Sequence, residues 1–138
     1  MNQLDTSLLL IDDDADDQEI FLAALGELPT AYPCETRSNG LQALNKLKEG
    51  SLRPSLIFLD LNMPLMDGKQ FLHELRRTDS ISHIPVIMYS TTNDARTIAE
   101  TMELGANRFV SKPPSYTGLV SLLQHLLEQE KMIQPAQA

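Results

Sequence analysis

Residues 7–28 read SLLLIDDDADDQEIFLAALGEL, and the two parts of this stretch differ in the spacing of their apolar residues. Residues 7–11 form a short, almost continuously apolar run, which is typical of a strand covered on both faces. Residues 16–28 place their apolar side chains on one helical face, namely Ile20, Phe21, Ala24, Leu25 and Leu28. The stretch therefore predicts a strand followed by a helix, with aspartates at the junction.

The same alternation continues along the chain. It predicts further strands at residues 33–37, 55–59, 85–89 and 108–111, and further helices at residues 41–48, 68–77, 94–104 and 115 to about 131. Repeated strand–helix units with right-handed crossovers build an α/β fold with a doubly wound five-stranded parallel sheet between helices. We expect a three-layer sandwich with strand order 2-1-3-4-5. The second strand is the most polar and belongs at an edge.

Two of the expected helices have a clear apolar stripe. Residues 94–104 carry Ala95, Ile98, Ala99 and Met102 at helical spacing, and Gly105 follows as a helix terminator. The last helix carries Leu119, Leu122, Leu123, Leu126 and Leu127. Both stripes are expected to face the core.

Composition limits the class of protein. The 138 residues, 42% of them hydrophobic, suffice for one domain, which we expect over residues 1–132 with a disordered tail over residues 133–138. A net charge of −8 disfavours broad binding to nucleic acid or to an anionic membrane. The single cysteine, Cys34, excludes an intrachain disulfide. No apolar run approaches the roughly 18 residues of a membrane span. These features predict a cytoplasmic protein.

Carboxylates follow two strands that should be neighbours. The first strand leads directly into Asp12 and Asp13, and the third leads into Asp60. Ligands of doubly wound sheets bind outside the carboxyl ends of the strands, where the winding direction reverses. Carboxylates gathered there repel one another unless a hard cation such as Mg²⁺ or Mn²⁺ neutralises them. A simpler alternative exists for Asp14, Asp16, Asp17 and Glu19, which would cap the helix or complement its dipole.

Other polar groups follow the fourth and fifth strands, which end in Ser90 and Lys112. A hydroxyl and an ammonium that converge on a carboxylate and a metal are suited to hold a transferring phosphoryl group. Lys112 opposite Asp60 would also form an ordinary ion pair. Each residue alone is weak support, but their joint placement at the strand ends predicts phosphoryl chemistry.

The chain resembles the receiver domains of bacterial two-component response regulators over nearly its whole length. The resemblance rests on LLLIDD ending at Asp13, LIFLDLNMPLMDG ending at Gly68, PVIMYS ending at Ser90, and GANRFVSKP ending at Pro113. It implies a flavodoxin-like, CheY-like fold. Residues 77–92 look similar to stand-alone receivers that serve phytochrome-type and hybrid kinases.

The resemblance implies a role for each matching residue. Asp60 would accept a phosphoryl group, with Mg²⁺ or Mn²⁺ held by Asp12, Asp13, Asp60 and the backbone carbonyl of Asn62. Ser90 and Lys112 would bind the phosphoryl group, and Phe109 would turn inward as the switch that follows Ser90, unless it is a plain core aromatic. Gly68 would supply φ freedom in a turn, and the Lys112–Pro113 bond would be cis.

The resemblance also implies the partners. A sensor histidine kinase or a phosphotransfer protein would donate the phosphoryl group. A downstream protein target would then be bound, or a homodimer formed, through the fourth helix, fifth strand and fifth helix. The chain would be a signalling domain rather than an enzyme, with weak self-catalysed phosphorylation and dephosphorylation.

Two other functions fit parts of the pattern. A haloacid-dehalogenase-type phosphohydrolase would use Asp12 as its nucleophile, but Asp16 stands where threonine or valine is expected and no acid follows Lys112 before Glu128. An unphosphorylated interaction domain of the same fold would usually lack an acid or the lysine. The phosphorylated aspartate, Asp12 or Asp60, distinguishes the phosphohydrolase from the receiver.

Overall fold

Strands and helices alternate along residues 6–133, which are the residues that this computed structural model describes. The strands are β1 (Leu8–Ile11), β2 (Cys34–Arg37), β3 (Leu56–Leu59), β4 (Val86–Ser90) and β5 (Arg108–Ser111). The helices are α1 (Ala15–Gly26), α2 (Gly40–Glu49), α3 (Gly68–Arg76), α4 (Ala95–Glu103) and α5 (Tyr116–Ile133). The predicted ranges agree with these bounds to within two residues. The expected tail was placed one residue too early, because α5 includes Ile133, and its remainder lies outside the described residues.

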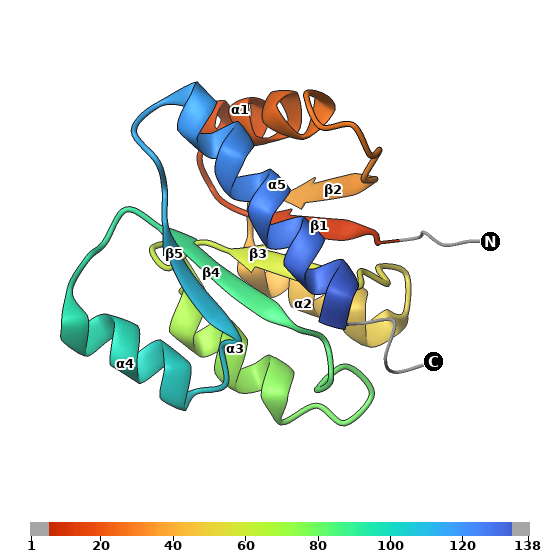
Figure 1. The fold of residues 1–138 in the computed structure, drawn as a ribbon. Coiled ribbons are helices and arrows are strands. Elements are labelled where there is room, and N and C mark those ends of the chain that lie inside the picture. The colour runs from red at the N-terminus through yellow and green to blue at the C-terminus, as the bar shows by residue number, and fades with distance from the viewer. Residues whose placement is uncertain (1–5, 134–138) are drawn as a thin grey trace.

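The strands form one parallel sheet in the order β2-β1-β3-β4-β5, as predicted (Figure 1). β2 lies at one edge, and its residues are only partly buried or exposed. β1, β3 and β4 are buried throughout. The polarity of the second strand was therefore a correct sign of its edge position.

Successive side chains of the central strands point to opposite faces of the sheet. In β1, Leu9 and Ile11 join the apolar cluster under α2 and α3, whereas Leu8 and Leu10 join the cluster under α1 and α5. β3 and β4 alternate in the same way. Figure 1 shows the result, with α1 and α5 on one face and α2, α3 and α4 on the other. Burial on both faces explains why these strands read as continuous apolar runs.

Polar residues fix where the helices start. Asp14, Asn39, Asp67 and Asp94 are the N-caps of α1, α2, α3 and α4, and each side chain accepts hydrogen bonds from backbone N–H groups of the first turn. Capping confirms the simpler alternative for Asp14. Gly105 follows α4 with a φ of 111°, as expected of a helix terminator.

The stripe predicted for α4 was wrong. Met102 is 42% exposed, Ala95 and Ala99 are exposed, and Thr101 is the buried residue of this helix. α4 covers the β5 edge of the sheet, so a narrower arc of the helix faces the core. The hydroxyl of Thr101 donates to the carbonyl oxygen of Ile98 at 2.8 Å, which makes a polar residue tolerable there.

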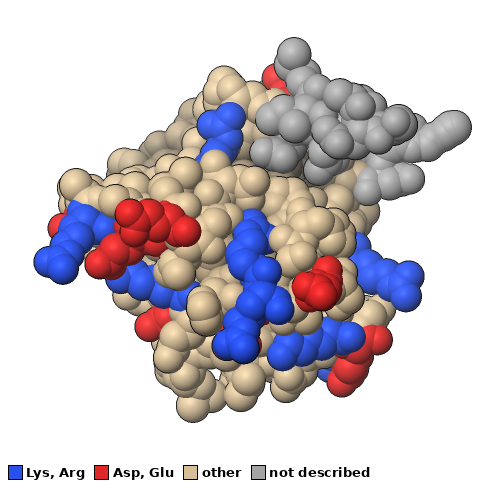
Figure 2. All heavy atoms as spheres, turned by 90° about the horizontal axis from the view of Figure 1, so that it is seen from below, with Lys and Arg blue, Asp and Glu red and all other residues tan. Residues whose placement is uncertain are grey.

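Charged side chains of both signs lie interspersed on the face seen in Figure 2. Ion pairs join α3 to α4 through Lys69 and Glu100, and link Arg96 to Glu100 within α4 at 3.6 Å. This face therefore presents no broad surface of one sign. Among residues 6–133, no helix is both long enough and apolar enough to cross a membrane.

Candidate functional site

Three carboxylates meet at the carboxyl ends of β1 and β3. Ile11 pairs with Leu59 in the sheet, so the residues that follow, Asp12 and Asp60, leave neighbouring strands side by side. One oxygen from each of Asp12, Asp13 and Asp60 lies within 4.8 Å of the others. Asp12 is fully buried and Asp60 is 8% exposed, whereas Asp13 is exposed. The sequence predicted this convergence from the strand order alone.

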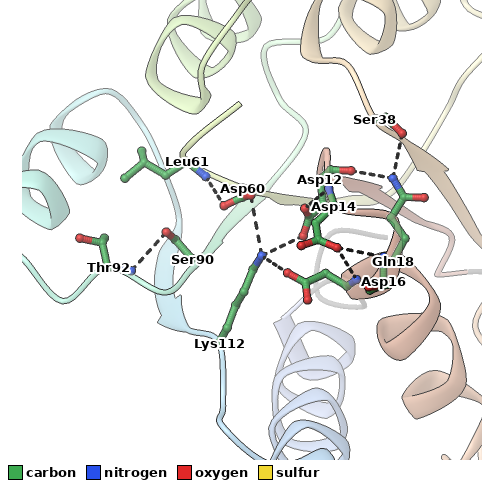
Figure 3. Close-up of polar contacts among 11 residues, drawn as sticks. Asp12, Asp14, Asp16, Gln18, Ser38, Asp60, Leu61, Ser90, Thr92 and Lys112 are labelled. Carbon is green, nitrogen blue, oxygen red and sulfur yellow. Dashed lines mark hydrogen bonds and ion pairs between the residues drawn. The ribbon is translucent and has the colours of Figure 1, made fainter. Parts of the chain in front are cut away.

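The surroundings of Asp60 hold its carboxylate in one orientation. Its Oδ1 accepts a hydrogen bond from the backbone N–H of Leu61 at 2.8 Å (Figure 3). The pKa of Asp60 is raised to about 6, mainly by burial and to a smaller extent by the nearby Asp12. The ammonium of Lys112 and the backbone N–H groups of Leu61 and Asn62 act in the opposite direction and limit this rise. A buried carboxylate with few donors is poorly solvated, and added positive charge nearby would stabilise its ionised form.

Gly68 serves this site in a different way from that predicted. Its φ is not in the left-handed region, which Leu65 occupies instead with a φ of 69°. A Cβ at Gly68 would lie 2.6 Å from the carbonyl oxygen of Asp60 and 2.8 Å from the Cα of Leu61. The glycine is needed because the start of α3 packs directly on the backbone of the candidate nucleophile.

Lys112 brings the positive charge. It follows β5, and its Nζ lies 2.9 Å from Asp12 Oδ2 and 3.7 Å from Asp60 Oδ2 (Figure 3). The Oδ2 atom of Asp17 lies 2.8 Å from the same nitrogen. Burial by itself lowers the pKa of Lys112, but the bonds to Asp17 and Asp12 and the charge of Asp60 outweigh it and raise the pKa above its ordinary value. The ammonium is therefore charged throughout the physiological range.

The closest partner of Lys112 was missed in the sequence. Asp17 lies in the first turn of α1, where a favourable interaction with the helix dipole explains an acid completely. Its side chain instead reaches across to the end of β5. The only available signal was its position five residues after Asp12, which carries no specificity without the structure.

Ser90 ends β4 at the same edge of the sheet and is 1% exposed. Its hydroxyl accepts a hydrogen bond from the backbone N–H of Thr92 at 3.3 Å, and its carbonyl oxygen accepts one from the N–H of Lys112 at 2.9 Å. Phe109 lies in β5 and is partly buried against the cluster under α2 and α3, as are Leu104 and Met66. The side chain of Asn62 is exposed.

The Lys112–Pro113 bond was wrongly expected to be cis. The described residues contain no cis peptide bond. The two isomers of an X-Pro bond differ by only about 0.5–1 kcal/mol, so the sequence does not select one. With the trans bond, Lys112 still contacts the carboxylates.

The donor set fits a hard divalent cation. Carboxylate oxygens are the ligands that Mg²⁺ and Mn²⁺ prefer, and the exposed position of Asp13 leaves one side of the cluster open to water. The N–H of Asp14 donates to Asp12 Oδ1 at 2.9 Å, and Gln18 Nε2 donates to the carbonyl oxygen of Asp12, which together fix this residue. The arrangement supports a metal beside a nucleophilic carboxylate and a lysine.

Comparisons with known proteins identify the family that this chain matches. The family model described as "Response regulator receiver domain" matches residues 8–132. The transcriptional regulatory protein CpxR homolog of Haemophilus influenzae is 34% identical over 124 residues, which are 90% of this chain and 51% of that protein. This chain spans about half or less of the length of several curated relatives that it matches.

Solved structures agree with that family. The crystal structure of the phosphorylated cyanobacterial phytochrome response regulator RcpA is 25% identical, with a TM-score of 0.83 over 91% of this chain and 93% of that chain. The crystal structure of the Mn²⁺-bound form of response regulator Rcp1 is 27% identical, with a TM-score of 0.78 over 88% and 91% of the two chains. On its fold, its carboxylate cluster and a family match over residues 8–132, the chain belongs to the receiver domain family of two-component response regulators.

Proposed function

We propose that Asp60 accepts a phosphoryl group from a phosphohistidine on a sensor histidine kinase or phosphotransfer protein. A carboxylate oxygen of Asp60 attacks the phosphorus, a P–O bond forms, and the P–N bond to the donor imidazole breaks as that ring takes up a proton. The product is an acyl phosphate on Asp60. The observation that carries the proposal is the buried Asp60 within 4.8 Å of two other carboxylates and 3.7 Å from the ammonium of Lys112.

The neighbouring residues have separate tasks. Asp12, Asp13, Asp60 and the backbone carbonyl of Asn62 would hold Mg²⁺ or Mn²⁺, which supplies positive charge against the incoming phosphoryl oxygens. The Mn²⁺-bound form of the similar response regulator Rcp1 supports this ligand class. Lys112 balances the charge that accumulates on the phosphoryl group, and the Ser90 hydroxyl donates to one of its oxygens.

Phosphorylation is proposed to control protein binding. When the Ser90 hydroxyl turns to the phosphoryl group, it leaves space that Phe109 occupies, so the surface formed by α4, β5 and α5 changes. The partly buried state of Phe109 suits a ring that moves between two positions. The expected partners are a downstream protein or a second copy of the chain on that surface.

The proposed site of action is the cytoplasm. The free thiol of Cys34 agrees with a reducing compartment.

The phosphohydrolase alternative fits the geometry less well. Asp12 is fully buried, with Oδ1 accepting from the N–H of Asp14 and Oδ2 from Lys112. Asp60 is 8% exposed and lies beyond hydrogen-bond distance from Lys112, so it is the more accessible of the two carboxylates to a phosphoryl donor.

Intact-mass analysis tests the phosphoacceptor directly. Wild-type protein incubated with acetyl phosphate and Mg²⁺ should gain one phosphoryl group, and excess EDTA should abolish the gain. Asp60→Asn should gain none, whereas the control Asp16→Asn, which changes an exposed acid, should behave as wild type. A gain that survives in Asp60→Asn would contradict the proposal and direct attention to Asp12. The absence of any gain in wild type with acetyl phosphate would instead favour a donor restricted to a kinase, or a binding domain that acts without phosphorylation.

A further inference from the structure

The ammonium of Lys112 lies among three carboxylates, but it is hydrogen-bonded to only two of them. A lysine has three N–H donors. Asp12 Oδ2 at 2.9 Å and Asp17 Oδ2 at 2.8 Å each accept one hydrogen bond. Asp60 Oδ2, at 3.7 Å, lies within ion-pair range but beyond hydrogen-bond distance. The lysine is therefore drawn towards β1 and α1 and away from the candidate nucleophile.

Asp17 differs from Asp12 in what happens when the site is filled. Asp12 belongs to the carboxylate cluster, so a divalent cation neutralises it and weakens its attraction for Lys112. Asp17 lies in the first turn of α1, and its side chain is 36% exposed. Asp17 is not one of the three clustered carboxylates, so a divalent cation held by them would leave it as an anionic partner of Lys112.

The start of α1 fixes Asp17 in this position. Asp14 caps the helix by accepting from the N–H of Asp17 at 3.2 Å, and Gln18 bonds to the carbonyl oxygen of Asp12. The backbone that carries Asp17 is thereby tied to the end of β1. Lys112 itself is only 12% exposed in its side chain, so it moves between partners inside the site rather than out into water.

We propose that Asp17 is a positioning residue that competes with the phosphoryl group for Lys112 and so limits how tightly the site binds that group. The inference rests on the proposed function, because it assigns Lys112 to the phosphoryl group on Asp60. Loss of the Asp17 charge frees the ammonium to meet the phosphoryl oxygens. The unphosphorylated state is stabilised by this ion pair, and the phosphorylated state must break it.

The first measurement concerns the contact alone, in metal-free protein. NMR of the Lys112 side chain, through its Cε and Nζ signals, compares wild type with Asp17→Asn, Asp17→Glu and Asp16→Asn. Asp16→Asn is the matched control, because Asp16 is exposed and lies in the same helical turn as Asp17. Both substitutions remove one negative charge. Asp17→Asn should shift the Lys112 signals and speed exchange of the ammonium protons with water. Asp16→Asn should leave them as in wild type, and Asp17→Glu should restore most of the wild-type behaviour.

The second measurement concerns the competition. Beryllofluoride with Mg²⁺ mimics the phosphoryl group, and its binding is followed by ¹⁹F NMR titration. Asp17→Asn should bind it about fivefold more tightly than Asp16→Asn, the size expected when one partly exposed ionic competitor is removed. The comparison between the two variants removes the general effect of one lost negative charge.

The outcomes separate the two ideas. Equal affinity in Asp17→Asn and Asp16→Asn, or weaker affinity in Asp17→Asn, overturns the competition, and so does an unchanged Lys112 signal in Asp17→Asn. A wild-type protein that shows the Lys112–Asp17 contact but binds no beryllofluoride with Mg²⁺ overturns the proposed function, and the competition falls with it.

Discussion

Individual residues of this protein owe their chemistry to where the fold buries them. Asp60, which lies among charged groups, and Cys34, which lies on the edge strand, are two examples. The carboxylate of Asp60 is buried among other charges at the carboxyl edge of the sheet. The thiol of Cys34 lies on the edge strand β2, where burial raises its pKa to about 12. Both shifts have measurable consequences.

Asp60 should make the metal-free protein less stable as pH rises. Its pKa of about 6 in the native state exceeds the ordinary value of 3.8, so between these values the folded protein binds the proton more tightly than the unfolded chain does. The free energy of unfolding therefore falls as pH rises from about 4 to about 6. Asp60→Asn removes this loss and should be more stable than wild type at pH 7 in EDTA by roughly 1–3 kcal/mol.

Urea unfolding between pH 4 and pH 8 checks this result. The stability difference between Asp60→Asn and wild type should shrink towards zero near the acid end of the range. Asp16→Asn, at an exposed position, should follow the wild-type pH profile. If the free energy of unfolding depended on pH in the same way in wild type and in Asp60→Asn, the pKa of Asp60 would not be raised by folding.

Cys34 should react slowly with alkylating agents. The thiolate is the reactive form, and a pKa of about 12 leaves very little of it at pH 8. Iodoacetamide should modify Cys34 in native protein at least about tenfold more slowly than in urea-unfolded protein, where the thiol regains an ordinary pKa near 8.5. Mass spectrometry of timed samples measures both rates. Equal rates would place the thiol in solvent.

At the scale of the elements, the junctions between strands and helices position the site. The turn from β3 into α3 brings the backbone of Gly68 against Asp60 and Leu61. Gly68 N–H donates to the carbonyl oxygen of Leu61 at 2.8 Å, and the Asp67–Gln70 capping box fixes the start of α3. This junction has no room for a side chain.

Gly68→Ala should therefore damage both stability and the site. An added Cβ would meet backbone atoms at 2.6 Å and 2.8 Å, and backbone cannot rotate away as a side chain does. We expect a loss of about 1–3 kcal/mol in the free energy of unfolding, as for overpacked positions, together with slower phosphorylation by acetyl phosphate. Gly26→Ala is the matched control, because nothing lies within 4 Å of its Cβ position in α1. It should be neutral or slightly stabilising. Similar effects of the two changes would refute the packing argument.

The element scale also shows where sequence reasoning succeeds and fails. β1, β3 and β4 were predicted because burial on both faces leaves an unmistakable apolar run. The apolar stripe of α4 was misassigned because periodicity does not reveal how wide an arc a helix buries at a sheet edge. Ile20 and Leu41 are likewise 45% and 44% exposed although they fit helical stripes. Contacts of single side chains lie further beyond the sequence, as Asp17 shows, because a local explanation for the acid was already sufficient.

At the scale of the whole molecule, the parallel sheet gathers the polar ends of β1, β3, β4 and β5 at one edge. The strand order followed from the alternation of elements, and the joint position of Asp12, Asp60 and Lys112 followed from that order. The sequence could not fix the distances among them. These distances depend on how α1 and the end of β5 pack at the carboxyl edge of the sheet.

Mg²⁺ should stabilise the folded protein as a whole. A ligand that binds only the native state adds RT ln(1 + [L]/Kd), which is about 1.4 kcal/mol at tenfold excess over Kd. The melting temperature should rise by several degrees, on the order of 2–8 °C per kcal/mol for a domain of this size range. Asp13→Asn should lose most of this increment, and Asp16→Asn should retain it. Differential scanning fluorimetry with Mg²⁺ and with EDTA measures the effect. An equal increment in Asp13→Asn would remove Asp13 from the ligands.

The ion pair between Lys112 and Asp12 joins residues 100 positions apart in the chain. A ribosome adds Asp12, Asp13 and Asp60 long before it adds Lys112, so the growing polypeptide holds these acids without their ammonium. β5 is also the last of the described strands to be made, and it pairs with β4 alone. Translation therefore completes the charge balance of the centre only at a late step. A prematurely terminated product that ends before β5 carries Asp12, Asp13 and Asp60 but lacks Lys112.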